Sequence, residues 1–331
     1  MRRKLLILAA AIAAFLLLGI AAGVAVFFSP LFTRYTESSA FRAAMEGETA
    51  KGLHFPRAHY APIRRTGALT AESERFEAEN GVKAMKSLEA HGISAKFDPW
   101  GVFVRQWRFD GIHVQSGEVE IQIYEAHPEA ITPKPWFTIL LPKSVYLKRI
   151  ESEQANVTWR LRGERSGFFG TRLLITPHGP DFEYVATGGR LKMALLPDLD
   201  LRRAHLLITK TLLTVYDIDL ASDSGSEESI RAQANAGIGQ DKSVDFKANF
   251  NTVPIRPWLP REWKGRLNGS AFGDLHWTGK DPKLESSSGE GSLRILDGRI
   301  DDVPLLQKLA ELARKKSFEH LELNECSLRF A

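Results

Sequence analysis

The most restrictive feature of this chain is an unbroken apolar run close to its N-terminus. Residues 5–28 carry no charge over 24 positions, and Arg2, Arg3 and Lys4 directly precede them. As a helix rising about 1.5 Å per residue, the run would be roughly 36 Å long, which is enough to cross a hydrocarbon core of about 30 Å. Flanking basic residues favour the cytoplasmic side. We therefore predict a single membrane anchor with the rest of the chain exported.

A cleaved signal peptide is the alternative interpretation of the same run. Signal peptides usually have apolar regions of about 7 to 15 residues that end in a small-x-small cleavage site. Here the best match to such a site, residues 23–25, is followed at once by three more apolar residues. An uncleaved anchor therefore fits the sequence better.

Charge and cysteine content limit the partners and the means of stabilisation. The net charge is +4, and three of these charges precede the apolar run, so the remainder carries +1 (4 − 3). No basic stripe stands out, and we predict no nucleic-acid partner. Cys326 is the single cysteine, so an exported domain must be held together by burial and strand pairing rather than by an intrachain disulfide.

Alternation of apolar and polar residues recurs along the exported part and predicts β-strands. It is clear at residues 157–162, 216–220, 244–250, 321–324 and 328–330. With turn signals at short intervals, this pattern predicts a mainly β protein built on a long antiparallel sheet, with one N-terminal transmembrane helix and a few short covering helices.

Residues 100–124 contain the strongest strand signal. Asp110-Gly111 and Ser116-Gly117 are typical of two-residue hairpin turns, which predicts a three-stranded meander. Asp297-Gly298 predicts another hairpin of this kind. The meander register would align six apolar side chains on one face and leave polar side chains on the other, solvent-exposed face. These six are Trp107, Phe109, Ile112, Val114, Val119 and Ile121.

Two segments have helical periodicity, and a third is predicted to have little structure. Residues 70–92 begin at a plausible N-cap, Thr70, and end at Gly92, which predicts an amphipathic helix. Residues 304–316 begin with proline, place leucines on one face and end in basic residues, which predicts a second helix. Residues 29–65 are predicted to be a connector with weak structure.

Catalytic chemistry has no recognisable signature in this chain. There is no P-loop, dinucleotide-binding, zinc-protease or nucleophile-elbow motif. His54 and His59 are the closest histidine pair, and their spacing in a proline-containing segment is poor for a metal. We predict a protein that is not an enzyme and has no metal or cofactor.

An apolar strand face is the candidate site. Its aromatic and branched residues could equally form a closed core or line a groove, because both uses require the same alternation. The candidate groove-lining residues are Trp107, Phe109, Ile112, Val114, Val119, Ile121, Trp159, Phe246 and Phe250.

The C-terminal third carries a family resemblance. Residues 256–280 (RPWLPREWKGRLNGSAFGDLHWTGK) contain a glycine-bearing strand pair. Residues 289–330 contain a G-x-L-x-I-x-D-G-x-I segment, a short leucine-rich helix and resumed strands. In this order, and with an N-terminal anchor, the chain resembles the AsmA-like family of bacterial envelope proteins.

That resemblance implies a location and a function. It implies an inner-membrane anchor with the N-terminus inside and a long, twisted, taco-like β-sheet in the periplasm. The open groove of this sheet would shield phospholipid acyl chains during cell envelope biogenesis, with other envelope proteins as further partners and no catalytic residues. We divide the chain into an anchor (1–29), a connector with helix (30–99), a groove region (100–253) and an AsmA-like region (254–331). The rival hypotheses are a structural or regulatory module for outer-membrane assembly that binds a partner by strand addition and an envelope enzyme.

Overall fold

The computed structural model describes residues 29–101, 106–122, 144–161, 163–179, 181–194, 196–209, 211–222, 227–238, 242–280, 286–301, 303–315 and 320–331. The predicted membrane anchor, residues 5–28, lies outside the described residues.

The described chain is mainly β, as predicted, and its 17 strands belong to one large sheet. The helices are α2 (Pro30–Thr36), α3 (Ser39–Leu53), the 3₁₀ turn η2 (Arg256–Trp258) and α5 (Pro304–Ala313). The strands are β1 (Arg57–Tyr60), β2 (Arg64–Arg65), β3 (Thr70–Glu79), β4 (Met85–Phe97), β5 (Gln106–Ile121), β6 (Ser144–Leu147), β7 (Ile150–Leu161), β8 (Glu164–His178), β9 (Asp181–Thr187), β10 (Arg190–Lys192), β11 (Leu199–Ile208), β12 (Leu212–Ala221), β13 (Ser229–Gly237), β14 (Val244–Pro254), β15 (Leu267–Gly279), β16 (Ser287–Asp301) and β17 (His320–Phe330).

Strand pairing follows the chain from one end of the sheet to the other. Strands β1 and β2 both pair with β3, and β3, β4 and β5 follow in order. β7 leads through β8 and β9 to β11, with β10 joining β8 and β11, and β11 to β17 are consecutive antiparallel neighbours. Roughly 14 strand positions, at about 4.8 Å each, give a sheet about 60 Å long.

The sheet is mixed, so the prediction of a wholly antiparallel sheet is wrong in one place. β5 pairs in parallel with both β6 and β7. Parallel neighbours need a connection of about a dozen residues or more, and residues 122–143 provide that length of chain. The sequence pattern of a strand does not encode the direction of its neighbour.

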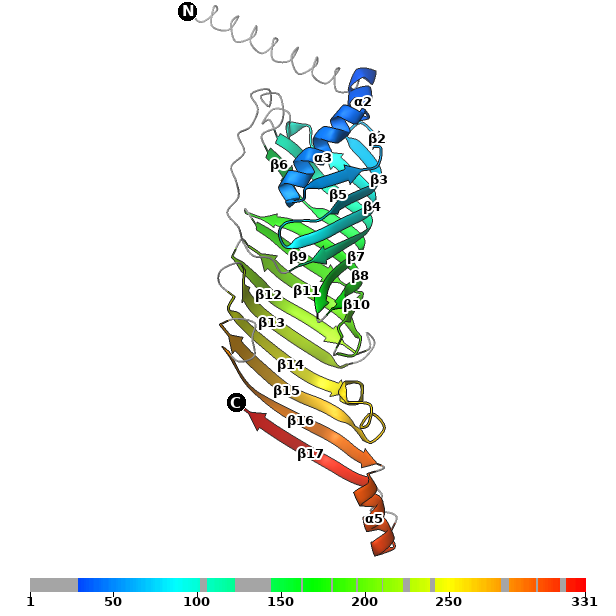
Figure 1. The fold of residues 1–331 in the computed structure, drawn as a ribbon, viewed down its shortest axis with the longest axis vertical. Helices are drawn as coiled ribbons and strands as arrows, with labels where there is room; N and C mark the ends of the chain where they lie inside the picture. Colours follow the sequence, from blue (N-terminus) through cyan, green and yellow to red (C-terminus); the bar gives the residue numbers. More distant parts are fainter. Residues whose placement is uncertain are drawn as a thin grey trace, which may run out of the picture.

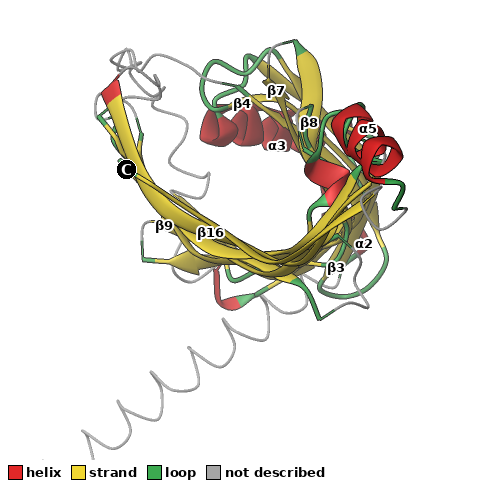
Figure 2. Ribbon diagram, turned by 90° about the horizontal axis from the view of Figure 1, so that it is seen from below, coloured by secondary structure: helices red, strands yellow, loops and turns green. Residues whose placement is uncertain are grey.

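The overall shape is a long curved sheet. Figure 1 shows the strands stacked along the long axis, with α2 and α3 near one end and α5 at the other. Seen down that axis, the strands bend into a trough-like section, and α3 lies inside the curve (Figure 2). We call the inner side of this curve the concave face and the outer side the convex face.

The predicted helix at residues 70–92 is wrong, because this segment forms β3 and most of β4. The side chains of Phe76, Ala78 and Ala90 are buried, and Phe76 lies opposite Ala90 in the strand pair. The apolar spacing here suits a helix and a strand almost equally. Pairing with β1 on one side and β5 on the other decides for the strand, because it satisfies the backbone along both edges.

The predicted meander is also wrong, because β5 runs unbroken through both predicted turns. Gly117 lies opposite Ala90, and a side chain there would approach the carbonyl oxygen of Glu89 to 3.3 Å. The absence of a side chain at Gly117 therefore allows the neighbouring strand β4 to approach closely. Similarly, Asp297-Gly298 lies within β16, where Asp297 has a φ of 51° beside an irregular register with β15, which is typical of a bulge rather than a hairpin.

Two further predictions concern helices. Residues 29–65 are not weakly structured, since they contain α2, α3, β1 and β2. The helix predicted at residues 304–316 is confirmed as α5, although it ends at Ala313.

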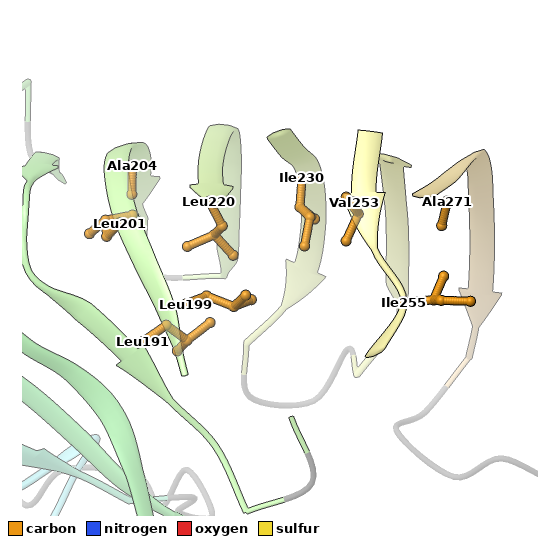
Figure 3. Packing of buried hydrophobic residues seen from close by; sticks show 9 residues of the cluster. All are labelled: Leu191, Leu199, Leu201, Ala204, Leu220, Ile230, Val253, Ile255 and Ala271. Atoms are coloured by element: carbon orange, nitrogen blue, oxygen red, sulfur yellow. The ribbon is translucent and has the colours of Figure 1, made fainter. Parts of the chain in front are cut away.

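The larger buried cluster lies where several strands meet their connections. Figure 3 shows its nine side chains, which successive strands contribute to one face. They are Leu191, Leu199, Leu201, Ala204, Leu220, Ile230, Val253, Ile255 and Ala271. Leu199 is only 1% exposed. A second cluster near α3 contains Phe55, Phe76, Ala78, Ala90 and Val114.

We predict that Leu199→Ala lowers the free energy of unfolding by about 2–5 kcal/mol, because it leaves a cavity in the larger cluster. The matched control is Leu212→Ala, since Leu212 is 38% exposed and should lose much less. Thermal and denaturant unfolding of the full chain measures both. Equal losses would contradict the assignment of the core.

Candidate functional site

The strand register aligns apolar side chains across the sheet. A central row takes one residue from each of twelve strands, from β3 to β16, and none of the twelve is charged. The central row consists of Ala71, Ala95, Ile112, Ile150, Ile175, Tyr184, Leu206, Val215, Ala234, Phe246, Trp277 and Gly289. Residues that pair directly across neighbouring strands lie on the same face, so this row is a continuous apolar path along the sheet.

A neighbouring second row has the same character and reaches the last strand. It is interrupted only by two small hydroxyl side chains. The second row consists of Ser73, Ile93, Val114, Ser152, Leu173, Ala186, Ala204, Ile218, Ala232, Ala248, Leu275, Gly291 and Phe330. The apolar surface is therefore at least two residues wide along most of the sheet.

The apolar rows lie on the concave face. Leu53 and Phe55, at the end of α3, contact the cluster that contains Val114 and Phe76. Figure 2 shows α3 inside the curve of the sheet. The side of the sheet that meets α3 is thus the inner one.

Most of the sequence-predicted lining residues fall on this face. Ile112 and Phe246 belong to the central row, and Val114 belongs to the second row. Val119 lies opposite Val157, Ile121 lies opposite Trp159, and Phe250 lies opposite Ile230. Phe109 lies opposite Phe97, with ring centroids 6.1 Å apart. The side chain of Trp107 lies outside the described residues. That these residues bind lipid stays a prediction.

Sequence reasoning missed many lining residues because the alternation changes phase within strands. Register irregularities separate Ser152 from Ala155, Val215 from Ile218 and Phe250 from Val253. Each irregularity shifts the inward-facing positions by one residue, so the apolar face continues although the period-2 pattern breaks. A positive φ at Thr252 marks the last of these points; because threonine rarely adopts this conformation, the sequence carried no signal for it.

The concave face is only partly covered. All twelve residues of the central row are partly exposed, and none is fully buried. Within the described residues the strands form a single sheet, and no second sheet lies over this face. Tyr184 is the one central-row residue with an ionisable side chain, and burial raises the pKa of its hydroxyl, which fits apolar surroundings.

The convex face is polar along the same strands. One row of directly paired residues there runs from β8 to β17 without an apolar side chain: Arg172, Thr187, Arg203, Asp219, Arg231, Asn249, Asp274, Ser292 and Arg329. Side-chain hydrogen bonds cross between strands on this face, such as that between His205 and Glu183 and that between His276 and Asp245 at 2.9 Å. The two faces therefore suit different environments.

Helix α3 is fixed at one end of the concave face. The backbone N–H of Tyr60 donates to Glu46 Oε1 at 2.9 Å, and His59 Nδ1 lies 3.0 Å from the same oxygen. The hydroxyls of Thr49 and Tyr60 are 3.3 Å apart. Burial raises the pKa of Tyr60. These contacts join the helix to β1 at this end of the concave face.

The described residues contain no group of histidine, cysteine and acidic side chains that could hold a metal ion. A hollow of about 440 Å³ lies at the ends of β12 to β16, lined by residues that include Asn235, Asp245 and Thr278. None of its lining residues belongs to the central row, and they form no cluster of catalytic side chains. The arrangement offers an extended apolar surface rather than a reactive centre.

No helix among the described residues is long and apolar enough to cross a bilayer.

Comparison with known proteins gives no relative: no family model matches the chain, and neither curated proteins nor solved structures give a significant match. The resemblance to the AsmA-like family therefore stays a prediction from sequence.

We predict a pH-dependent contribution from Glu120 on the convex face. Lys86 Nζ donates to Glu120 Oε1 at 2.9 Å and Arg160 Nε donates at 3.0 Å. The hydrogen bond from Lys86, followed by that from Arg160, lowers the pKa of this carboxyl from its ordinary value of 4.5. A lowered pKa stabilises the fold above the unfolded-state value, and the stabilisation disappears as the pH falls through the folded-state value.

Glu120→Gln should therefore lower Tm at about pH 7, and the Tm difference should shrink as the pH falls through the folded-state pKa of Glu120, where the carboxyl becomes protonated and as neutral as the amide. Glu164→Gln, at an exposed position that starts β8, is the control. A Tm difference between wild type and Glu120→Gln that does not shrink on acidification would contradict the prediction.

Proposed function

We propose that this protein holds or passes phospholipid acyl chains along the concave face of its sheet, as a non-enzymatic, lipid-handling protein of the periplasm that serves cell envelope biogenesis. The observation that carries this proposal is the central row, which is apolar across twelve strands and yet partly exposed throughout. A soluble protein rarely leaves a contiguous apolar surface of this extent without a ligand or partner.

The proposed mechanism needs no catalytic residue. Each buried acyl methylene gains about 0.8 kcal/mol relative to water, so an extended apolar surface can approach the environment of a bilayer for a lipid tail. Because the surface is continuous, a tail can move from one strand to the next without fully entering water. The polar head can stay at the open side of the trough.

The location in this proposal depends on the sequence. The uncharged run at residues 5–28, behind three basic residues, supports an inner-membrane anchor with the N-terminus inside and the sheet in the periplasm. Helices α2 and α3 follow this run directly in the chain, so the anchored end of the sheet is the end at which α3 lies.

The second candidate function is a module that binds an envelope protein by strand addition. One observation favours it: β17 pairs with β16 alone among the described strands, and Leu328 and Phe330 on it are 57% and 44% exposed. An edge of this kind can accept a strand from a partner. Strand addition does not explain why the central row is apolar and partly exposed, so lipid binding is the better-supported proposal.

We predict that a photo-crosslinking amino acid at Val215 captures phospholipid in membranes of cells expressing the full chain, because Val215 belongs to the central row. The same amino acid at Thr214, its neighbour on β12, is the control, since adjacent strand residues point to opposite faces. Mass spectrometry of the crosslinked protein reads out the adduct. Lipid adducts of equal yield at both positions, or at neither, would overturn the proposal.

Phe246→Glu should reduce co-purifying phospholipid by roughly tenfold, because a carboxylate replaces an aromatic ring of the central row and an apolar contact of this size is worth more than 1 kcal/mol. Lys247→Glu introduces the same side chain at the next position of β14, on the convex face, and should keep the lipid. Tm values verify that both variants are folded. Retention of lipid by folded Phe246→Glu would count against an acyl path through this row.

A further inference from the structure

A hollow on the convex face contains an exposed aromatic side chain. Tyr216 is 43% exposed, and the centroid of its ring lies 4.8 Å from that of the His205 imidazole. A hydrogen bond joins His205 to Glu183. Both residues adjoin central-row members in the chain, which places their side chains on the convex face. The imidazole therefore supports one side of the Tyr216 ring while the ring stays accessible to solvent.

A row of polar residues runs past this ring across five strands. The row pairs residue by residue from β12 to β16 and consists of Thr214, Asn235, Asp245, Thr278 and Ser288. Each of them adjoins a central-row residue in the chain, so the row lies on the convex face. Successive members are about 4.8 Å apart, the spacing of neighbouring strands. This spacing is close to the rise of one ring in an extended, β-linked glycan.

The polar row connects two hollows. The smaller hollow, of about 220 Å³, has Tyr216 in its lining, and the larger, of about 440 Å³, has Thr278. Asn235 and Asp245 line both, so the two hollows adjoin. Among the described residues that line the smaller hollow, Asp245 is the one anion and Lys247 the one cation. The surface is thus elongated, and around Tyr216 its charges balance.

The side chains of this surface match the chemistry of a sugar. A sugar ring has an apolar C–H face, which stacks on the electron-rich face of an aromatic ring, and hydroxyls that both donate and accept hydrogen bonds. Amides and hydroxyls also do both. Gln233 and Asn235 present two exposed amides on one face of β13, next to the Tyr216 ring. An anionic ligand would need an excess of cations, which the smaller hollow lacks.

We propose that the convex face between β12 and β16 binds a linear, uncharged, β-linked glycan. One sugar ring stacks on Tyr216, and the following rings lie along the polar row, where amides and hydroxyls meet their hydroxyl groups. The proposal is independent of acyl binding, because it uses the opposite face of the sheet.

The test is isothermal titration of the full chain, held in phosphatidylcholine nanodiscs, with chitohexaose. The wild type should bind saturably, and Tyr216→Ala should bind about tenfold more weakly because the stacking surface is lost. Tyr216→Phe keeps the ring and should bind like the wild type. Arg231→Ala changes an exposed residue on the same face of β13, outside both hollows, and is the matched control.

A second variant keeps the proposal testable if Tyr216→Ala does not fold. Gln233→Ala/Asn235→Ala removes two exposed amides and should also weaken binding about tenfold. Absence of binding by the wild type, or equal binding by folded Tyr216→Ala, overturns the proposal. Binding that disappears at raised salt also overturns it, because screening of this kind indicates ion pairs rather than an uncharged ligand. Lipid crosslinking at Val215 is read out without added glycan, so the two proposals fail separately.

Discussion

The backbone ladder between neighbouring strands is the interaction on which this structure depends. A single sheet of about 60 Å has no second sheet over it among the described residues, and the only cysteine, Cys326, is free. The ladder therefore holds the strands together and also sets which side chains share a face. A slip of one residue in any pair would move a strand's apolar set to the convex face, so the register of each pair carries both stability and the proposed function.

Because the sheet is curved, its apolar concave face is partly covered but remains partly accessible to solvent. Bulges add a residue on one strand and bend it, and in this sheet they occur in several neighbouring pairs, such as β7–β8, β11–β12 and β14–β15. Side chains such as Leu199 and Leu220, near covering connections, are buried, while the central row stays partly exposed. A flat sheet with the same pattern would instead expose its apolar face to water or aggregate through it.

The two ends of the sheet differ in the helices that they carry. At the end near the predicted anchor, α3 is fixed to β1 through Glu46 and Tyr60 and lies inside the curve. At the other end, α5 projects outward with Leu309 and Leu312 exposed. The proposed acyl path thus runs along the axis between these two unlike ends.

The sequence by itself determined the mainly β class, the helix at α5 and the identity of many residues on the apolar face, because alternation and helical spacing are local properties. It could not determine that residues 70–92 are strands, that Asp110-Gly111 lies inside a strand, or that β5 and β7 are parallel. Those outcomes depend on which backbone pairs with which, and Phe76 or Gly117 has its role only through a residue on another strand. The tertiary structure alone decided that the apolar residues from twelve strands form one row on a concave face, because bulges shift the alternation at points that local periodicity does not reveal.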